Sequence, residues 1–437
     1  MTSGHVASKR SFKTMHDMRP AGIGLRLYLV VMTVLRPLVP MLLRKRLKRG
    51  KEHPKRWREK LGLTDRVRPK GRLVWLHAVG LGEVMALRGV IAQLSKRDPS
   101  LSFLVTSSTK QSALVFEDNL PDKTIHQFLP IDVPAYVNRF LMHWSPNLLI
   151  WSEQDLWPAM GFYADEQSVP QVLINARMND AAFSERRLVK NIYRDIYRRF
   201  QFISAQDDRT RDNICALGRV DDVRVDGSIK PLPAAFQTDI KNAAALRSSI
   251  GSRMVWLVCP SHPADEQVAF AAHRDILETD PTAILVIIPR NVDRGAAIAH
   301  AAQSWQFSVN RRGLGQGIDT STQVFVADTY GEAGFWYKTA KCALIGGGFD
   351  AIEGHNPWEA VHLNCPAFHG PNFANFERDY HILDQTGGTI MVRDKDELVG
   401  AITAIDVIKM RRAQGQAVDL LMPSLNKLCS DLIALIE

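Results

Sequence analysis

Carboxylates follow two predicted strands in the first half of this sequence. Glu83 ends the segment HAVGLGE at residues 77–83, where glycines form a turn before a predicted helix. Glu153 and Asp155 come directly after the apolar run Leu148–Trp151. A carboxylate in either place can take a proton from an attacking hydroxyl or accept hydrogen bonds from a sugar. The structural alternatives are that Glu83 only complements the dipole of its helix and that Glu153 and Asp155 lie in a solvated loop.

Cationic side chains occur at two further strand ends. Lys230 ends the segment GSIK and can neutralise a carboxylate or phosphate of a substrate, although a lone lysine is more often an ordinary surface residue. Arg290 follows Pro289 at the end of an apolar run, where its guanidinium suits bidentate binding of phosphate. The segment NAR at residues 175–177 follows another strand and can face the same cleft as Glu153.

Two turns in the second half have features of phosphate sites. Residues 328–333, DTYGEA, read as a strand, a turn and the start of a helix. The triple glycine at 346–348 leads to EGHNPWE at 353–359. There Asn356 can cap a helix that begins with the next proline, and Glu359 lies at capping-box spacing, which is a complete structural explanation. The same pattern describes a nucleotide site, with helix N–H groups on a phosphate and Glu359 on both ribose hydroxyls. The glycines do not form a G-x-G-x-x-G fingerprint, which disfavours a dinucleotide-dependent oxidoreductase.

The elements that must position these residues alternate between short apolar runs and amphipathic stretches. This alternation predicts two doubly wound, Rossmann-like α/β halves with parallel sheets. Ligands of such sheets bind at the carboxyl ends of the strands, so we expect the site in the cleft between the halves. The predicted domains are a basic N-terminal region (1–62), an acceptor-side domain (63–232) and a nucleotide-sugar domain (233–437), with the helix after Pro423 packing back on the first half. The ten predicted strands are Leu73–Ala78, Phe103–Thr106, Leu148–Trp151, Gln171–Ile174, Phe202–Ala205, Met254–Cys259, Ala283–Ile288, Gln323–Val326, Cys342–Ile345 and Ala367–Phe368.

Composition limits the class of protein. The chain has 437 residues, 46% of them hydrophobic and 23% charged, which suits two globular domains. Its five cysteines form no C-x-x-C pair, so neither a disulfide framework nor a zinc knuckle is expected. Residues 1–70 contain 19 Lys and Arg against 4 Asp and Glu, a net charge of +15, and the remainder carries −6. A nucleic-acid-binding protein would more often spread its basic charge over the folded body, so this asymmetry favours an anionic membrane surface and no nucleic acid.

The basic charge lies beside an apolar stretch, residues 21–43. As a helix this stretch would be about 35 Å long, enough to cross a bilayer core. Arg26 and Arg36 interrupt it, however, and Pro37 and Pro40 would kink it. We therefore favour a helix that lies in or enters the membrane interface over a simple span, with a buried helix and two snorkelling arginines as the alternative. The basic run that follows predicts the cytoplasmic side of the membrane.

The ordered set of segments resembles one family, the transferases that attach 3-deoxy-D-manno-octulosonic acid (Kdo) to lipid A. The resemblance covers nearly the whole chain after about residue 20. The matching segments are RWREKLG at 56–62, HAVGLGE at 77–83, EQDLWP at 153–158, NAR at 175–177, GSIK at 227–230, PR at 289–290, DTYGEA at 328–333, GHNPWE at 354–359 and GPNF at 370–373.

This resemblance implies a GT-B fold and an inverting transfer of Kdo from CMP-Kdo to a lipid A precursor, lipid IVA, at the cytoplasmic side of the cell inner membrane. CMP-Kdo would be the donor substrate, with no separate cofactor and no metal. Glu83 would be the general base, assisted by Glu153 and Lys230. CMP would be held by Pro289, Arg290, Gly331, Glu332, Ala333, Asn356, Pro357, Trp358 and Glu359.

The sequence also departs from the family pattern. Gly80 replaces a serine, Asp155 a glutamate, Asn291 a histidine and Ala333 a leucine, and residues 260–266 read PSHPADE in place of STHEGEE. These departures leave two alternatives open. One is a related membrane-bound transferase with another activated sugar or lipid acceptor, and the other is a non-catalytic, nucleotide-binding regulator on the same scaffold.

Overall fold

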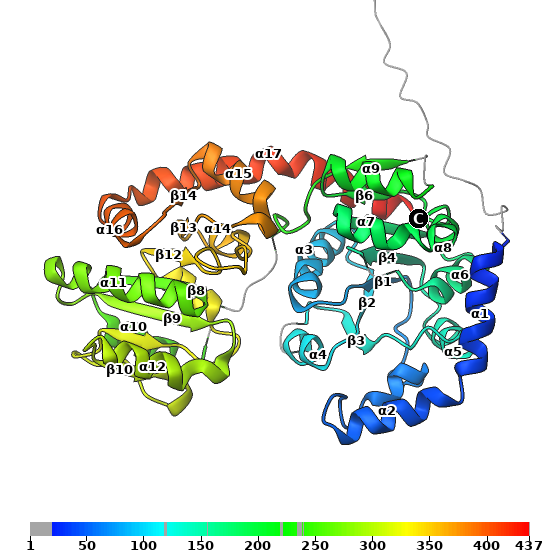
Figure 1. The fold of residues 1–437 in the computed structure, drawn as a ribbon, viewed down its shortest axis with the longest axis horizontal. Coiled ribbons are helices and arrows are strands. Elements are labelled where there is room, and N and C mark those ends of the chain that lie inside the picture. The colour runs from blue at the N-terminus through cyan, green and yellow to red at the C-terminus, as the bar shows by residue number, and fades with distance from the viewer. Residues whose placement is uncertain are drawn as a thin grey trace, which may run out of the picture. The chain divides into compact units, whose positions relative to one another are not determined.

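The protein is described by a computed structural model that covers residues 20–117, 120–154, 156–218, 222–233, 238 and 240–436. The chain forms two compact units, Met1–Ala234 with Ser424–Glu437, and Ala235–Pro423. Figure 1 shows that each unit is built around its own sheet with helices packed against it.

The first unit is a parallel sheet with strand order β3-β2-β1-β4-β5-β6-β7. Its strands are β1 (Leu73–His77), β2 (Ser102–Ser107), β3 (Thr124–Phe128), β4 (Leu148–Ser152), β5 (Gln171–Ala176), β6 (Ile203–Ala205) and β7 (Val223–Val225). Its helices are α1 (Ile23–Leu35), α2 (Leu38–Lys48), η1 (Trp57–Leu61), α3 (Leu81–Arg97), α4 (Lys110–Glu117), α5 (Pro134–Trp144), α6 (Pro158–Glu166), α7 (Asp180–Arg187), α8 (Lys190–Tyr197) and α9 (Asp208–Ala216).

The second unit is also a parallel sheet, with strand order β10-β11-β9-β8-β12-β13-β14. Its strands are β8 (Val255–Ser261), β9 (Ile284–Pro289), β10 (Val309–Arg311), β11 (Val324–Val326), β12 (Cys342–Ile345), β13 (Ala367–His369) and β14 (Thr389–Met391). Its helices are α10 (Ala243–Ile250), α11 (Pro263–Thr279), η2 (Val292–Arg294), α12 (Gly295–Ser304), η3 (Arg312–Leu314), α13 (Ala333–Thr339), α14 (Trp358–His362), η4 (Ala374–Phe376), α15 (Glu377–Thr386), α16 (Lys395–Ala404) and the start of α17 (Val407–Ala434).

Both faces of the second sheet are buried, as the near-continuous apolar strands predict. Val255 and Leu257 of β8 belong to one hydrophobic cluster, whereas Trp256 and Val258 belong to the other. Successive side chains of a strand point to opposite faces, so the two clusters lie on the two sides of the sheet. With both faces covered by helices, polar side chains are left to the strand ends.

All ten predicted strands are present, and the fold class is confirmed. Four strands were not predicted, β3, β7, β10 and β14, and each lies at an edge of its sheet. Edge strands pair on one side only and face solvent more, so their sequences carry a weaker apolar signal. The residues of β7 and β10, for example, are all only partly buried.

The residues after Pro423 confirm the prediction that they pack on the first half, although the predicted domain boundaries placed them in the second. Residues from Ser424 onward group with the first unit, where Arg224 pairs with Asp431 at 2.6 Å and Arg97 donates to Asn426 at 2.9 Å. The predicted N-terminal region likewise groups with the first unit instead of standing apart.

The first two helices form a bent apolar pair on the first unit. No single helix in the described part of the chain is long and apolar enough to cross a membrane, but α1 and α2 together meet that test with a bend of 65°. α1 packs against α5, α6 and α8 (Figure 1). Its backbone is tied down at the start, where Gly22 N–H donates to Asp195 at 2.8 Å.

A buried carboxylate connects α1 to the body of the unit. Asp132 accepts hydrogen bonds from the Tyr28 hydroxyl at 2.9 Å and from the N–H groups of Ala159 and Met160 at 2.8 and 2.9 Å. The last two bonds satisfy free donors at the start of α6. Burial raises the pKa of Asp132 to about 6, against the opposing effect of these three donors. The Asp132 carboxylate therefore holds both α1 and the start of α6.

We expect Tyr28→Phe to loosen α1, because Asp132 stays buried and loses one donor. The local opening free energy of residues 23–35 should fall by roughly 1 kcal/mol, seen as faster amide hydrogen–deuterium exchange. Tyr330→Phe is the control, since that side chain is 54% exposed, and it should leave the exchange of α1 unchanged. Equal protection of α1 in Tyr28→Phe and the wild type would contradict the anchoring role of this bond.

Candidate active site

Glu83 lies in the first turn of α3, immediately beyond β1. Its Oε2 accepts hydrogen bonds from the N–H groups of Val79 and Gly80, both at 3.1 Å. The carboxylate thus complements the helix start, as the structural alternative predicted. The two backbone donors also fix the position of the Glu83 carboxylate at the end of β1.

Glu153 follows β4 in a conformation that few residues adopt. Its φ is +66°, and its N–H donates to Ile174 O at 3.2 Å on the neighbouring β5. A non-glycine residue in this region costs free energy, and such residues cluster at functional sites. The turn directs Glu153 toward Glu83, with which it shares a side-chain hydrogen bond.

Asn175 links Glu153 to the segment that carries Lys230. Asn175 is fully buried, and its own φ is +54°. Its amide N–H donates to Glu153 Oε1 at 3.3 Å, and its Oδ1 accepts from the N–H of Ile229 at 3.2 Å. The strand ends of β4 and β5 and the turn before Lys230 are therefore joined through one side chain. The sequence places the segment NAR, which contains Asn175, near the same cleft as Glu153, but it does not predict a specific role for the Asn175 side chain.

The electrostatics of Glu153 reflect this crowding. Burial raises its pKa to about 7, and the charge of Glu83 and their hydrogen bond add to the effect. Lys230 and Arg177 act in the opposite direction. The protonated form of Glu153 is therefore favoured by its surroundings. The structure thus brings together Glu83, Glu153 and Lys230, as predicted, and adds Arg177. Asp155 lies outside the described residues.

Arg290 stands at the end of β9 in the second unit. Pro289 is the last residue of the strand, and Arg290 N–H donates to Ser261 O at 3.1 Å. Its side chain is exposed, and it makes no hydrogen bond or ion pair with the rest of the described chain. An unpaired guanidinium at the carboxyl ends of parallel strands is suited to an anionic ligand.

Residues 331–333 lie at the start of α13, but the Glu332 side chain is already engaged. It pairs with Arg312, whose Nε lies 2.9 Å from Oε1. Asp328 holds the same loop, because it accepts from the Gly313 N–H at 2.7 Å and pairs with Arg311. A ligand at 331–333 would therefore meet backbone groups and not the Glu332 carboxylate.

The segment from Asn356 to Glu359 is similarly divided between packing and binding. Asn356 Oδ1 accepts from the Trp358 N–H at 3.1 Å, but the helix begins at Trp358 and not at Pro357, which is the N-cap residue, so the predicted cap at Asn356 is wrong. Trp358 is fully buried, and its indole N–H donates to Asp379 at 2.8 Å. Its side chain therefore belongs to the core, and its backbone N–H is already engaged by Asn356. Glu359 is partly buried in the first turn of α14.

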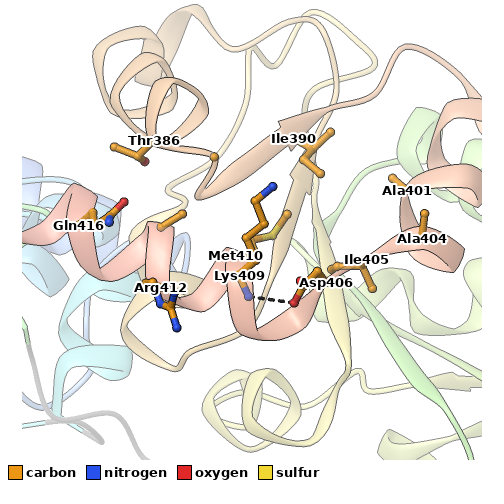
Figure 2. Close-up of a pocket in the computed structure, with 12 residues that line it drawn as sticks. Thr386, Ile390, Ala401, Ala404, Ile405, Asp406, Lys409, Met410, Arg412 and Gln416 are labelled. Carbon is orange, nitrogen blue, oxygen red and sulfur yellow. Dashed lines mark hydrogen bonds between the residues drawn. The ribbon is translucent and has the colours of Figure 1, made fainter.

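A pocket of about 570 Å³ lies elsewhere in the second unit. Figure 2 shows it between the end of α15, β14, α16 and the start of α17, where Asp406 accepts from the Lys409 N–H at 2.9 Å. It includes Gly387, which precedes β14, so it lies at the amino end of that strand. No predicted site residue lines it, and ligands of parallel α/β sheets bind at the opposite edge. It is not the candidate site.

Comparison with known proteins decides the family. Residues 55–232 match the model of the 3-deoxy-D-manno-octulosonic-acid transferase (kdotransferase) family. A probable mitochondrial 3-deoxy-D-manno-octulosonic acid transferase of Arabidopsis thaliana is 31% identical over 387 residues, 86% of this chain and 87% of that protein. The chain belongs to the Kdo transferase family. It is accordingly a glycosyltransferase.

Other comparisons agree in family and fold. The Kdo transferase of Rickettsia felis is 30% identical over 76% of this chain and 71% of its own length. A putative UDP-N-acetylglucosamine 2-epimerase from Listeria monocytogenes aligns over 83% of this chain and 98% of its own, with a TM-score of 0.53 and 13% identity. At that identity the likeness concerns the fold alone, and it supports the GT-B arrangement of two parallel α/β units.

Glu153 should make the stability of the protein depend on pH. Its folded-state pKa is raised above its ordinary value of 4.5, so its contribution to stability is fully present below about pH 4.5 and is lost as the pH rises through about 7. Glu153→Gln cannot ionise and should lose less stability than the wild type across this window. Thermal unfolding at pH 5 and pH 8 measures the difference.

The exposed Glu166 offers a matched control for this measurement. Glu166→Gln should follow the wild-type pH dependence. If Glu153→Gln also follows the wild type, the pKa of Glu153 is not raised.

Proposed function

We propose that this Kdo transferase takes its sugar from CMP-Kdo and attaches it to a lipid A precursor, lipid IVA, in lipopolysaccharide biosynthesis at the cytoplasmic side of the inner membrane. The hydrogen-bonded pairing of Glu83 with Glu153 beside Lys230 is the observation that carries this proposal. The CMP donor, the lipid acceptor and the role of each residue rest on the family together with the site chemistry.

The proposed reaction is a direct displacement with inversion. An acceptor hydroxyl gives its proton to Glu83 while its oxygen forms a bond to the anomeric carbon of Kdo. The bond from that carbon to the phosphate oxygen breaks, and CMP leaves with the electron pair. Glu153 and Lys230 assist by holding Glu83 in place and by balancing charge in the transition state.

The second unit is proposed to hold the nucleotide. The exposed guanidinium of Arg290 makes no hydrogen bond or ion pair with the described residues and would receive phosphate charge as CMP departs. Backbone N–H groups at Gly331–Ala333 and Asn356 would take further polar contacts, and Pro289, Pro357 and Trp358 would shape the walls. Glu359 would accept the ribose hydroxyls.

The first two helices are proposed to lie in the membrane interface. One face of α1 packs on the unit through Leu25, Tyr28, Leu29 and Met32. The opposite face leaves large apolar side chains exposed, among them Ile23 (88%), Leu27 (64%) and Val34 (70%). The basic side chains of α2 follow directly. An exposed apolar face beside clustered cations suits an anionic bilayer surface.

Glu83→Gln should lower kcat by roughly 10²–10⁴-fold, because glutamine cannot take the proton of the acceptor. Its amide oxygen can still accept from the Val79 and Gly80 N–H groups, so the fold should be kept. The assay is transfer from CMP-Kdo to lipid IVA by purified protein. Glu185→Gln, on an exposed residue of α7, should keep wild-type activity, and undiminished transfer by Glu83→Gln would remove Glu83 as the base.

Leu27→Glu should weaken binding to vesicles that contain an anionic phospholipid, because it places a charge in the exposed apolar face. A several-fold loss in a flotation assay is expected, since one charged residue in the hydrocarbon region costs roughly 2.5–3.5 kcal/mol at most. Leu420→Glu is the matched control, because Leu420 is 67% exposed on α17. Equal vesicle binding by both variants would contradict the membrane role of α1.

A further inference from the structure

Two histidines of the second unit meet beside Arg290. His262 directly follows β8, and His355 lies in the loop after β12. Their Nε2 atoms are 2.7 Å apart, and their rings are nearly parallel, with an angle of 7° between the planes. The ring centres are 5.0 Å apart, well beyond the distance between the nitrogens, so the rings meet by their nitrogen edges and not by their faces.

The backbone of each histidine is held in place by a group that is itself buried. The backbone N–H of His262 donates to Asp265 Oδ2 at 2.9 Å, and the backbone N–H of Gly347 donates to the same oxygen at 2.7 Å. The His355 carbonyl accepts from the hydroxyl of the fully buried Tyr380 at 2.9 Å. A side chain at Gly347 would press on the His355 ring, because a Cβ there would lie 3.1 Å from its Cδ2. The pair is therefore a built feature of the strand ends.

The hydrogen count of this pair has a chemical consequence. A bond between two Nε2 atoms needs one N–H and one lone pair, so the two rings cannot both be donors there. In the neutral pair, the ring that donates through Nε2 has a bare Nδ1, and the other ring carries its hydrogen on Nδ1. One added proton gives both Nδ1 atoms a hydrogen and the pair a positive charge. The protonated pair then carries one Nδ1–H on each outer side, and either of them can donate to an oxyanion.

We propose that His262 and His355 act as one proton-sharing unit that takes up a proton when the donor binds and then, with Arg290, binds the phosphate of that donor through one of its outer Nδ1–H groups. This inference rests on the proposed CMP-linked donor and adds a recognition element to its site. Because the phosphate belongs to the nucleotide, CMP alone is sufficient for the test.

The surrounding charges keep the unliganded pair neutral. Burial, together with the charges of His262 and Arg290, lowers the pKa of His355 to about 4, and Asp350 acts in the opposite direction. Burial also lowers the pKa of His262, with Arg290 and Arg294 on the same side and Asp350 and Glu266 opposed. Glu266 is itself neutralised by Arg294, at 2.7 Å. An arriving phosphate supplies the negative charge that this cluster lacks, so binding and protonation favour each other.

The test is calorimetric titration of the full chain with CMP at pH 7.5 in buffers of different ionisation enthalpy. The wild type should take up close to one proton per CMP bound, whereas cytidine, which has no phosphate, should bind without uptake. His262→Gln and His355→Gln should lose the uptake and bind CMP about tenfold more weakly. The phosphate of CMP could also take up a proton. If the uptake is lost in the variants, the proton acceptor is the histidine pair and not the phosphate.

His300→Gln is the control, because His300 is exposed on α12, and it should behave as the wild type. CMP binding without proton uptake by the wild type overturns the histidine proposal and leaves the proposed donor intact. Proton uptake that persists in both variants overturns it as well. If the wild type does not bind CMP at all, the proposed donor is wrong and the histidine proposal fails with it.

Discussion

Burial of both faces of a parallel sheet is the constraint on which this structure depends. A strand covered on both sides can carry little besides apolar side chains, so the chain must place its polar chemistry where each strand stops. Glu153 and Asn175 follow this rule in the first unit, and Arg290 and His262 follow it in the second. Because the strands run parallel, residues far apart in the sequence arrive at one edge of the same sheet.

That edge is where the molecule accepts unfavourable local arrangements. Glu153 and Asn175 both have positive φ angles, and two carboxyl groups share one small space. Backbone donors on Glu83, the amide of Asn175 and the nearby cation of Lys230 make this arrangement tolerable. Burial and the neighbouring charge of Glu83 raise the pKa of Glu153, so its protonated form is favoured.

The N-terminal helices show a second use of apolar surface. α1 is apolar on two faces, one packed on the unit and anchored by Tyr28 and Asp132, and one exposed. A helix with only the packed face would be an ordinary part of the core. A helix without the bond from Tyr28 to Asp132 would be attached to the unit less rigidly. With both, the helix carries an apolar surface that is rigidly attached to the unit holding the proposed base.

The sequence by itself determined the fold class, the ten interior strands and the family. Strands inside a sheet are apolar throughout, and motifs in a fixed order need no geometry to be recognised. The edge strands β3, β7, β10 and β14 were missed because solvent tolerates mixed side chains there. Only the tertiary structure decided which polar side chains pair with one another and which side chains enter the core. It paired Glu332 with Arg312, sent Trp358 into the core, joined Glu153 to Glu83 and brought His262 to His355. These contacts join segments up to 93 positions apart, and no local pattern encodes which distant side chain will face another or how burial will then shift its proton.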